Sequence, residues 1–221
     1  MRDIVDKFHT NAPSTFQGLM NSIFKPFLTK FVLVFFYDIL IYNRSWKDHV
    51  QHVDRVLKLL EEKQLYAKTS KFFFGVQEVE YLGHILSDEG VKLDPNKIKS
   101  IKEWKVPTTI KKLRGFLGLT GYYRKFVKNY GRIAAPLTTL LKKDAFSWTP
   151  EATKAFEHLK EAMCLAPVLA TPDFTKTFIV ECDASGNGIG AVLMQERRPI
   201  AFESRPIKGN YLQKPIYEKE M

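Results

Sequence analysis

The sequence has little cysteine: only Cys164 and Cys182 occur among 221 residues. Two widely separated cysteines give neither the ligand spacing of a zinc site nor a disulfide framework. They favour a reducing intracellular compartment, cytoplasm or nucleus, over secretion. No signal peptide opens the chain, and its most apolar run, residues 31–42, is too short to span a bilayer. These absences argue against a disulfide-rich secreted domain and a membrane partner.

Acidic residues are scarce in one quarter of the chain. Residues 92–145 hold 14 Lys and Arg but only 3 Asp and Glu, a net charge of +11. The rest of the chain holds 20 Lys and Arg and 21 Asp and Glu, a net charge of −1. Aromatic residues, including Tyr122, Tyr123 and Phe126, are interleaved with these basic side chains. Such a block favours a polyanionic partner, most simply nucleic acid. A solvated lysine-rich surface is the alternative.

The most distinctive stretch is Phe31-Val-Leu-Val-Phe-Phe-Tyr-Asp-Ile-Leu-Ile-Tyr42, in which Asp38 is the only residue that is neither aliphatic nor aromatic. Its β-branched and aromatic residues predict two strands, 31–36 and 39–42, joined by a tight turn at Tyr37-Asp38. A carboxylate inside an apolar run is costly unless it lies at a turn or has a charge partner. Asp38 is therefore either a metal ligand on a rigid hairpin tip or a structural turn residue.

Helical periodicity and capping residues predict several helices elsewhere in the chain. An α+β fold is expected, with strands at 79–86 and 91–93, joined by a turn at 87–90, and further strands at 178–183 and 191–194. The predicted helices lie at 14–25, at 46–63 behind a Ser45 cap, at 95–104 behind Asp94, after Thr108 or Thr109, and from Trp148 to before Pro167.

Four segments, in order, resemble reverse transcriptases from gypsy-type long-terminal-repeat retrotransposons. The run Val34-Phe-Phe-Tyr-Asp-Ile-Leu-Ile-Tyr42 is similar to the V-F-F-D-D-I-L-I-Y segment of that family. The other three segments are Asn11-Ala-Pro-Ser-Thr-Phe-Gln17, Leu113-Arg-Gly-Phe-Leu-Gly-Leu-Thr-Gly-Tyr-Tyr-Arg124 and Asp183-Ala-Ser-Gly-Asn-Gly-Ile-Gly-Ala-Val-Leu-Met194. The resemblance covers nearly the whole chain.

This resemblance implies a division of the chain into four parts. Residues 1–90 would form the C-terminal part of a polymerase palm, including a hairpin that resembles the primer grip. Residues 91–147 would form a basic helical thumb. Residues 148–176 would be the connection, and residues 177–221 the first strands of a ribonuclease H-like domain. The implied activities are RNA-directed DNA polymerization and ribonuclease H cleavage, each with Mg²⁺ as cofactor.

The resemblance also implies which carboxylates would act in catalysis and bind metal. Asp38 matches the polymerase site, and Asp183 and Glu220 match the first two ribonuclease H carboxylates. The family has two aspartates at the hairpin tip, whereas here the first of these positions is Tyr37. A phenol is a weak substitute for a carboxylate, and the resemblance places a further polymerase aspartate upstream of Asn11, where this sequence does not supply it. The later ribonuclease H carboxylates are not supplied either, so the chain is expected to lack both activities. A non-catalytic nucleic-acid-binding module and a non-functional relic are the alternatives.

The residues implied to bind nucleic acid lie in two segments. Tyr81, Leu82, Gly83 and His84 match the primer grip, where Gly83 would allow a nucleic-acid backbone to approach; an ordinary hairpin glycine is equally common. A thumb helix would present Gly115 and Gly118 to the minor groove of a template–primer duplex, although the glycines would also suit a helix–helix crossing. The cations expected to contact phosphates are Arg114, Arg124, Lys125 and Lys128. Deoxynucleotides are expected as substrates by family alone, and the sequence does not indicate an oligomeric state.

Overall fold

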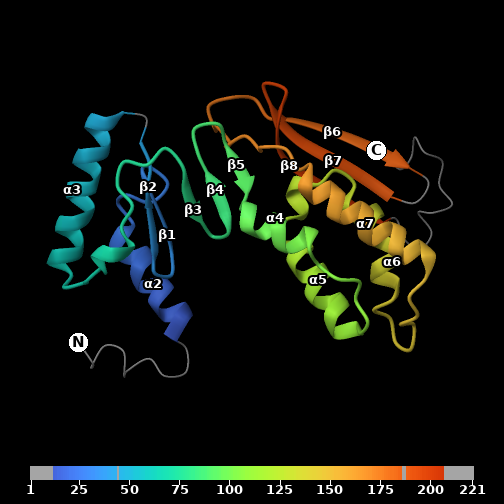
Figure 1. Ribbon diagram of the computed structural model, residues 1–221. Helices are drawn as coiled ribbons and strands as arrows, with labels where there is room; N and C mark the ends of the chain where they lie inside the picture. The colour runs from blue at the N-terminus through green and yellow to red at the C-terminus, as the bar shows by residue number, and fades with distance from the viewer. Residues whose placement is uncertain (1–11, 44, 186–187, 207–221) are drawn as a thin grey trace. The chain divides into compact units, whose positions relative to one another are not determined.

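The computed structural model describes residues 12–43, 45–185 and 188–206, and these residues form helices and strands of a mixed α+β fold (Figure 1). The chain divides into two compact units, of which the first ends at Tyr81 and the second begins at Leu82. Within the described residues, no helix combines the length and apolar character needed to cross a membrane.

The first unit is a β-hairpin packed against two helices. Helix α2 (Ala12–Phe24) precedes strands β1 (Val32–Phe35) and β2 (Asp38–Ile41), and helix α3 (Trp46–Glu62) follows them. A short 3₁₀ turn, η1 (Thr69–Lys71), and strand β3 (Val79–Tyr81) complete the unit. Its core collects the apolar stripe of each helix and the start of the hairpin: Met20, Phe24, Phe31, Val32, Val56 and Leu60. The predicted helices at 14–25 and 46–63 are confirmed.

The turn of the hairpin lies one residue earlier than predicted. Phe35 pairs with Asp38, so the two turn residues are Phe36 and Tyr37 rather than Tyr37 and Asp38. Phe36 adopts a left-handed conformation, with φ 50°. Asp38 is therefore the first residue of strand β2 and pairs with Phe35 where the turn closes.

The second unit consists of helices around one core, against which Phe202 of a three-stranded sheet packs. Its elements are β4 (His84–Leu86), β5 (Val91–Leu93), α4 (Pro95–Lys102), α5 (Ile110–Tyr122), η2 (Arg124–Phe126), α6 (Tyr130–Thr139), α7 (Pro150–Cys164), β6 (Ile179–Ser185), β7 (Gly188–Gln195) and β8 (Arg198–Pro206). Strands β6, β7 and β8 form an antiparallel sheet in sequence order. The core runs from Leu93 through Phe116 and Phe156 to Leu169, so α7 belongs to the same core as α4, α5 and α6.

The helix starts of this unit follow their capping residues. The side chain of Asp94 accepts a hydrogen bond from the Asn96 N–H, and Thr109 and Thr149 cap α5 and α7 in the same way. Each cap satisfies a backbone donor that the first helical turn leaves without a partner. These three caps confirm the predicted helix starts.

The predicted strand at 79–86 is interrupted. It ends at Tyr81 and β4 begins at His84, because Leu82 and Gly83 both adopt left-handed conformations, with φ 53° and 71°. The sequence pattern does not predict this break, because leucine favours negative φ and adopts positive φ only where tertiary contacts support it. The strand predicted at 191–194 is also longer than expected, and β8 had no predicted counterpart.

Gly90 provides a test of how β5 is held in the second unit. The N–H of Val91 donates to the Leu169 carbonyl at 2.8 Å, and a Cβ on Gly90 would overlap that carbonyl oxygen. Gly90 also has φ 137°, a conformation that suits glycine alone. We expect Gly90→Ala to lower the free energy of unfolding of this unit by about 3 kcal/mol.

The measurement is urea unfolding followed through the fluorescence of Trp104 and Trp148, which both lie in this unit. Gly118→Ala is the matched control, because a Cβ at that helical position meets nothing within 4 Å. It should raise stability by about 1 kcal/mol through helix propensity. Equal stability of the Gly90→Ala variant and the parent would contradict the role given to Gly90.

Candidate nucleic-acid interface and catalytic positions

The tip of the β1–β2 hairpin carries the two positions that the sequence resemblance assigns to a polymerase metal site. Asp38 is exposed at the start of β2, and Tyr37 precedes it in the turn with 77% of its surface exposed. The Tyr37 ring stacks on Phe16 of helix α2, with ring centroids 4.6 Å apart and an interplanar angle of 29°. An aromatic pair thus occupies the position where the resemblance places a carboxylate.

Gln17 of helix α2 holds this turn in place. Its Oε1 accepts a hydrogen bond from the Phe36 N–H at 2.6 Å, and its Nε2 donates to the Val34 carbonyl at 3.3 Å. These bonds give hydrogen-bond partners to two backbone groups of the hairpin, one in the turn and one in β1. Sequence reasoning missed this role, although Gln17 ends the motif Asn11–Gln17, and that position was the available signal.

The hairpin tip does not fit a paired-metal centre. The described residues contain no group of three or more His, Cys, Asp or Glu side chains that could hold a metal ion. Two-metal chemistry needs several carboxylates around the two ions, and the tip supplies Asp38 alone. Burial raises the pKa of the Tyr81 hydroxyl, and the negative charge of nearby Asp38 raises it further.

Tyrosine hydroxyls hold the Leu82–Gly83 turn within the second unit. Tyr122, the last residue of α5, donates to the Leu82 carbonyl at 2.9 Å, and Tyr123 donates to the Gly83 carbonyl at 2.8 Å. A Cβ on Gly83 would lie 2.8 Å from the Tyr123 hydroxyl oxygen. The packing of Tyr123 therefore explains why glycine occupies position 83, without requiring the approach of a nucleic acid.

His84 follows this turn and is almost fully buried. Its Nδ1 lies 2.8 Å from the Leu82 carbonyl, which can only accept, so Nδ1 carries the proton. Its Nε2 is buried without a hydrogen-bond partner, and its ring lies 5.4 to 5.6 Å from those of Tyr122, Tyr123 and Phe126. Burial lowers the pKa of His84, and the positive charge of Lys125 lowers it further. The hydrogen bond to the Leu82 carbonyl acts in the opposite direction and raises this pKa, but the net shift is downward. A neutral imidazole thus completes the aromatic cluster behind the turn.

Helix α5 has one buried face and one open face. Leu113, Phe116 and Thr120 are buried, while Arg114 and Gly118 are exposed. The three glycines of α5 have different surroundings. A Cβ on Gly115 would contact the Trp104 ring and a Cβ on Gly121 would contact the Tyr130 hydroxyl, whereas the Cβ position of Gly118 is open. Close approach by a ligand is therefore possible at Gly118, one turn along the helix from Arg114.

Three basic residues, Arg124, Lys125 and Lys128, follow α5 in the sequence. Lys125 lies 5.4 Å from the centroid of the Phe126 ring, and partial burial lowers the pKa of its ammonium group. Arg124 is 3.9 Å from the Glu203 carboxylate, an exposed and weak contact. Lys128 is exposed. Arg114, Arg124, Lys125 and Lys128 thus all remain at the surface of the second unit.

Asp183 lies in a shallow cleft between α6 and the sheet of the second unit. The cleft has a volume of about 310 Å³, and its lining includes Asn129, Arg132, Ser204 and Arg205. The Gly131 N–H donates to the Ser204 hydroxyl at 2.7 Å, which joins α6 to β8 at this point. Glu220, the other predicted carboxylate of this site, lies outside the described residues.

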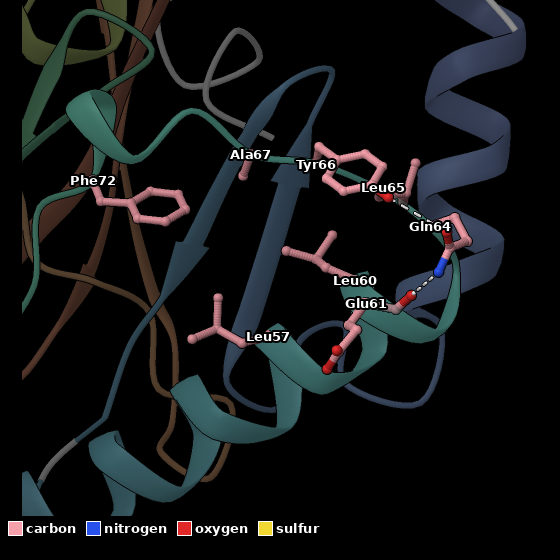
Figure 2. A pocket seen from close by; sticks show the side chains of 8 residues that line it. All are labelled: Leu57, Leu60, Glu61, Gln64, Leu65, Tyr66, Ala67 and Phe72. Atoms are coloured by element: carbon pink, nitrogen blue, oxygen red, sulfur yellow. Dashed lines mark hydrogen bonds between the residues drawn. The ribbon is translucent and has the colours of Figure 1, made fainter. Parts of the chain in front are cut away.

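The first unit has a separate apolar groove, of about 360 Å³, near the C-terminal end of α3 (Figure 2). It is lined by Leu57, Leu60, Glu61, Gln64, Leu65, Tyr66, Ala67 and Phe72. The Gln64 side chain donates to the Glu61 carbonyl at 3.1 Å, which closes the end of the helix. No predicted site residue lines this groove.

The fold is consistent with that of a partial reverse transcriptase with a ribonuclease H-like segment. Residues 9–86 match the family model of the reverse transcriptase (RNA-dependent DNA polymerase), and residues 148–221 match the RNase H-like domain found in reverse transcriptase. The chain therefore belongs to the reverse transcriptase and ribonuclease H region of long-terminal-repeat retrotransposon Pol polyproteins.

Two relatives and one solved structure illustrate the match. The chain is 42% identical over 213 residues to the Retrovirus-related Pol polyprotein from transposon 297 of Drosophila melanogaster, and 39% identical over 211 residues to that from transposon gypsy of the same organism. These matches cover 96% and 90% of this chain but only 20% of each relative. The foamy viral protease-reverse transcriptase in complex with RNA/DNA hybrid is 25% identical, with a TM-score of 0.86, over 95% of this chain and 29% of the viral chain.

A double-mutant cycle tests the contact between Gly83 and Tyr123. Tyr123→Phe should cost about 1 kcal/mol of stability, because the Gly83 carbonyl loses its donor. Gly83→Ala should cost about 2 kcal/mol from its positive φ and from its clash with the Tyr123 hydroxyl. The double variant should cost about 1 kcal/mol less than the sum of the two, because removing the hydroxyl relieves that clash.

Tyr122→Phe is the matched control in this cycle. It removes a similar hydrogen bond, but the Tyr122 side chain is not within 4 Å of the Gly83 Cβ position. Its effect should therefore add to that of Gly83→Ala without coupling when urea unfolding is measured. Additivity in both cycles would show that Tyr123 does not constrain Gly83.

Proposed function

We propose that the chain is part of an RNA-directed DNA polymerase and that its second unit binds a template–primer duplex. The observation that carries this proposal is the open face of α5, where Gly118 has free space beside Arg114 and where Arg124, Lys125 and Lys128 follow at the surface. The local net charge of +11 over residues 92–145 supports the same partner. The similar foamy viral enzyme is described in complex with an RNA/DNA hybrid.

The contacts available on this face are of the kind that bind phosphates. Lysine and arginine neutralise the backbone and release counterions, and such contacts fix position without reading sequence. The Tyr81-Leu82-Gly83-His84 segment would lie beside the primer strand, as the resemblance implies. Binding should therefore depend strongly on salt and little on base sequence.

The residues assigned to catalysis form an incomplete set. Both enzyme families generally use divalent metal ions, and we propose Mg²⁺ as the ion and deoxynucleotides as the polymerase substrate. Asp38 would be the ligand at the polymerase position, and Asp183 and Glu220 would be ligands at the ribonuclease H position. Since Tyr37 leaves Asp38 as the single carboxylate of the hairpin tip, we propose that the 221-residue chain binds duplex without extending a primer.

The functional division of the chain remains part of this proposal. Palm residues would run to 90, thumb residues from 91 to 147, the connection from 148 to 176, and the ribonuclease H-like segment from 177 onward. Helix α7 of the connection shares its core with the thumb helices. A binding assay therefore requires the full chain, because a thumb peptide ending at residue 147 would lose the packing of Phe156 and Leu159.

The full chain should not extend a primer in the presence of Mg²⁺ or Mn²⁺. Tyr37→Asp should leave it inactive, because the described residues would then offer only two adjacent carboxylates at the tip. The assay is incorporation of labelled deoxynucleotide on an RNA template with a DNA primer, compared with a preparation from cells carrying empty vector. Extension by the unaltered chain above that background would refute the prediction.

Duplex affinity should fall steeply as salt is raised. If four to six phosphates are contacted, log K should fall against log salt with a slope of about −4 to −5. Replacing Arg114, Arg124, Lys125 and Lys128 with alanine should weaken binding and flatten the slope by about 3 to 4. Gly118→Leu should weaken binding without changing the slope, because it blocks close approach and leaves every charge in place.

Fluorescence anisotropy with a labelled duplex over a salt series measures both quantities. A charge-matched control replaces four exposed lysines of the first unit, Lys25, Lys47, Lys68 and Lys71, with alanine. This control should keep more of the parental slope than the variant of the second unit. If the two quadruple variants behave alike, the basic residues of the second unit act only through net charge.

A further inference from the structure

The β1–β2 hairpin tip presents aromatic surface that the proposed duplex interface does not use. One face of the Tyr37 ring stacks on Phe16, and with 77% of the residue exposed the opposite face is open to solvent. Phe35, just before the turn, is 45% exposed and packs edge-on against Phe36, with ring centroids 4.6 Å apart. These rings form an aromatic tip, defined here as Phe16, Phe35, Phe36 and Tyr37.

The aromatic tip is held rigidly by polar contacts. The Gln17 side chain bonds to the hairpin backbone at the Phe36 N–H in the turn and at the Val34 carbonyl in β1. Residues Phe35 and Asp38 pair across the hairpin. A flat ring on a fixed turn loses little conformational entropy when a second flat group stacks on it.

The chemistry around the ring identifies the kind of group that would stack there. Asp38 follows Tyr37 and is exposed. An apolar protein surface covering the tip would remove this carboxylate from water without a partner, which is costly, and a phosphate would be repelled by its charge. A nucleobase combines a π face for the ring with polar edges that tolerate a nearby carboxylate.

We propose that the Tyr37–Phe16 pair binds an unpaired base of single-stranded DNA or RNA. The inference rests on the proposed function, because it assumes a chain that handles nucleic acid, but it concerns a different unit and a different form of the ligand. Aromatic side chains bind single strands by stacking, and loss of one such side chain weakens binding by about tenfold. Tyr37 thereby gives the tip a binding role in place of metal coordination.

The test compares single-stranded and duplex probes on the full chain. Fluorescence anisotropy is measured with labelled single-stranded DNA and RNA of about 12 nucleotides and with a blunt duplex. Tyr37→Ala should weaken binding of both single strands about tenfold and change the duplex affinity less than about twofold. Tyr37→Phe, the matched control, keeps the ring and should bind all probes as the parent does. The salt slope should be the same in the parent and in Tyr37→Ala, because stacking releases no counterions.

A second readout does not depend on affinity alone. Tyr37→Trp places an indole on the exposed tip, and its fluorescence should be quenched when a single strand binds, beyond any quenching of Trp46, Trp104 and Trp148 in the parent. If Tyr37→Ala binds single strands as tightly as the parent while duplex binding persists, this inference is overturned and the proposed function stands. If the parent binds neither single strand nor duplex, both are overturned.

Discussion

The donation of two tyrosine hydroxyls to a two-residue left-handed turn is the interaction on which the second unit's candidate interface depends. The carbonyls of Leu82 and Gly83 accept from Tyr122 and Tyr123, which lie at the end of α5. The rotation of α5 is in turn fixed by buried side chains such as Phe116. The packing of α5 therefore both secures the Leu82–Gly83 turn and keeps Arg114 and Gly118 on the open face. The two segments implied to bind nucleic acid are thus positioned by the same helix.

The first unit shows how a supporting structure can persist around an altered site. Gln17 bonds to the hairpin backbone and not to a side chain at position 37, so the turn does not require an aspartate there. The Tyr37 ring gains a stacking partner in Phe16. Tyr37 is thus accommodated at the tip of a hairpin whose strands pair in register from Val32–Ile41 to Phe35–Asp38.

Much of the fold was predictable because local signals and tertiary packing agree. Ser45, Asp94 and Thr149 cap helices where the sequence placed them, since a capping side chain acts within three residues. The left-handed Leu82 was not predictable, because the hydroxyl that supports it comes from 40 residues away. Strand β8 was missed because its prolines and charged residues interrupt any apolar alternation, and its extended conformation depends on pairing with β7.

The glycines of α5 show why sequence could indicate the candidate interface without resolving it. Three glycines at intervals of three suggest close approach, and each lowers helix stability by roughly 1 kcal/mol relative to alanine. Gly115 and Gly121 have intramolecular neighbours in Trp104 and Tyr130, whereas Gly118 has none. Helix periodicity cannot distinguish these cases, because the neighbours lie on other segments of the chain. Of these three glycines, only Gly118 has no neighbour in the described fold that would exclude a side chain. An external partner would explain why glycine occupies this position.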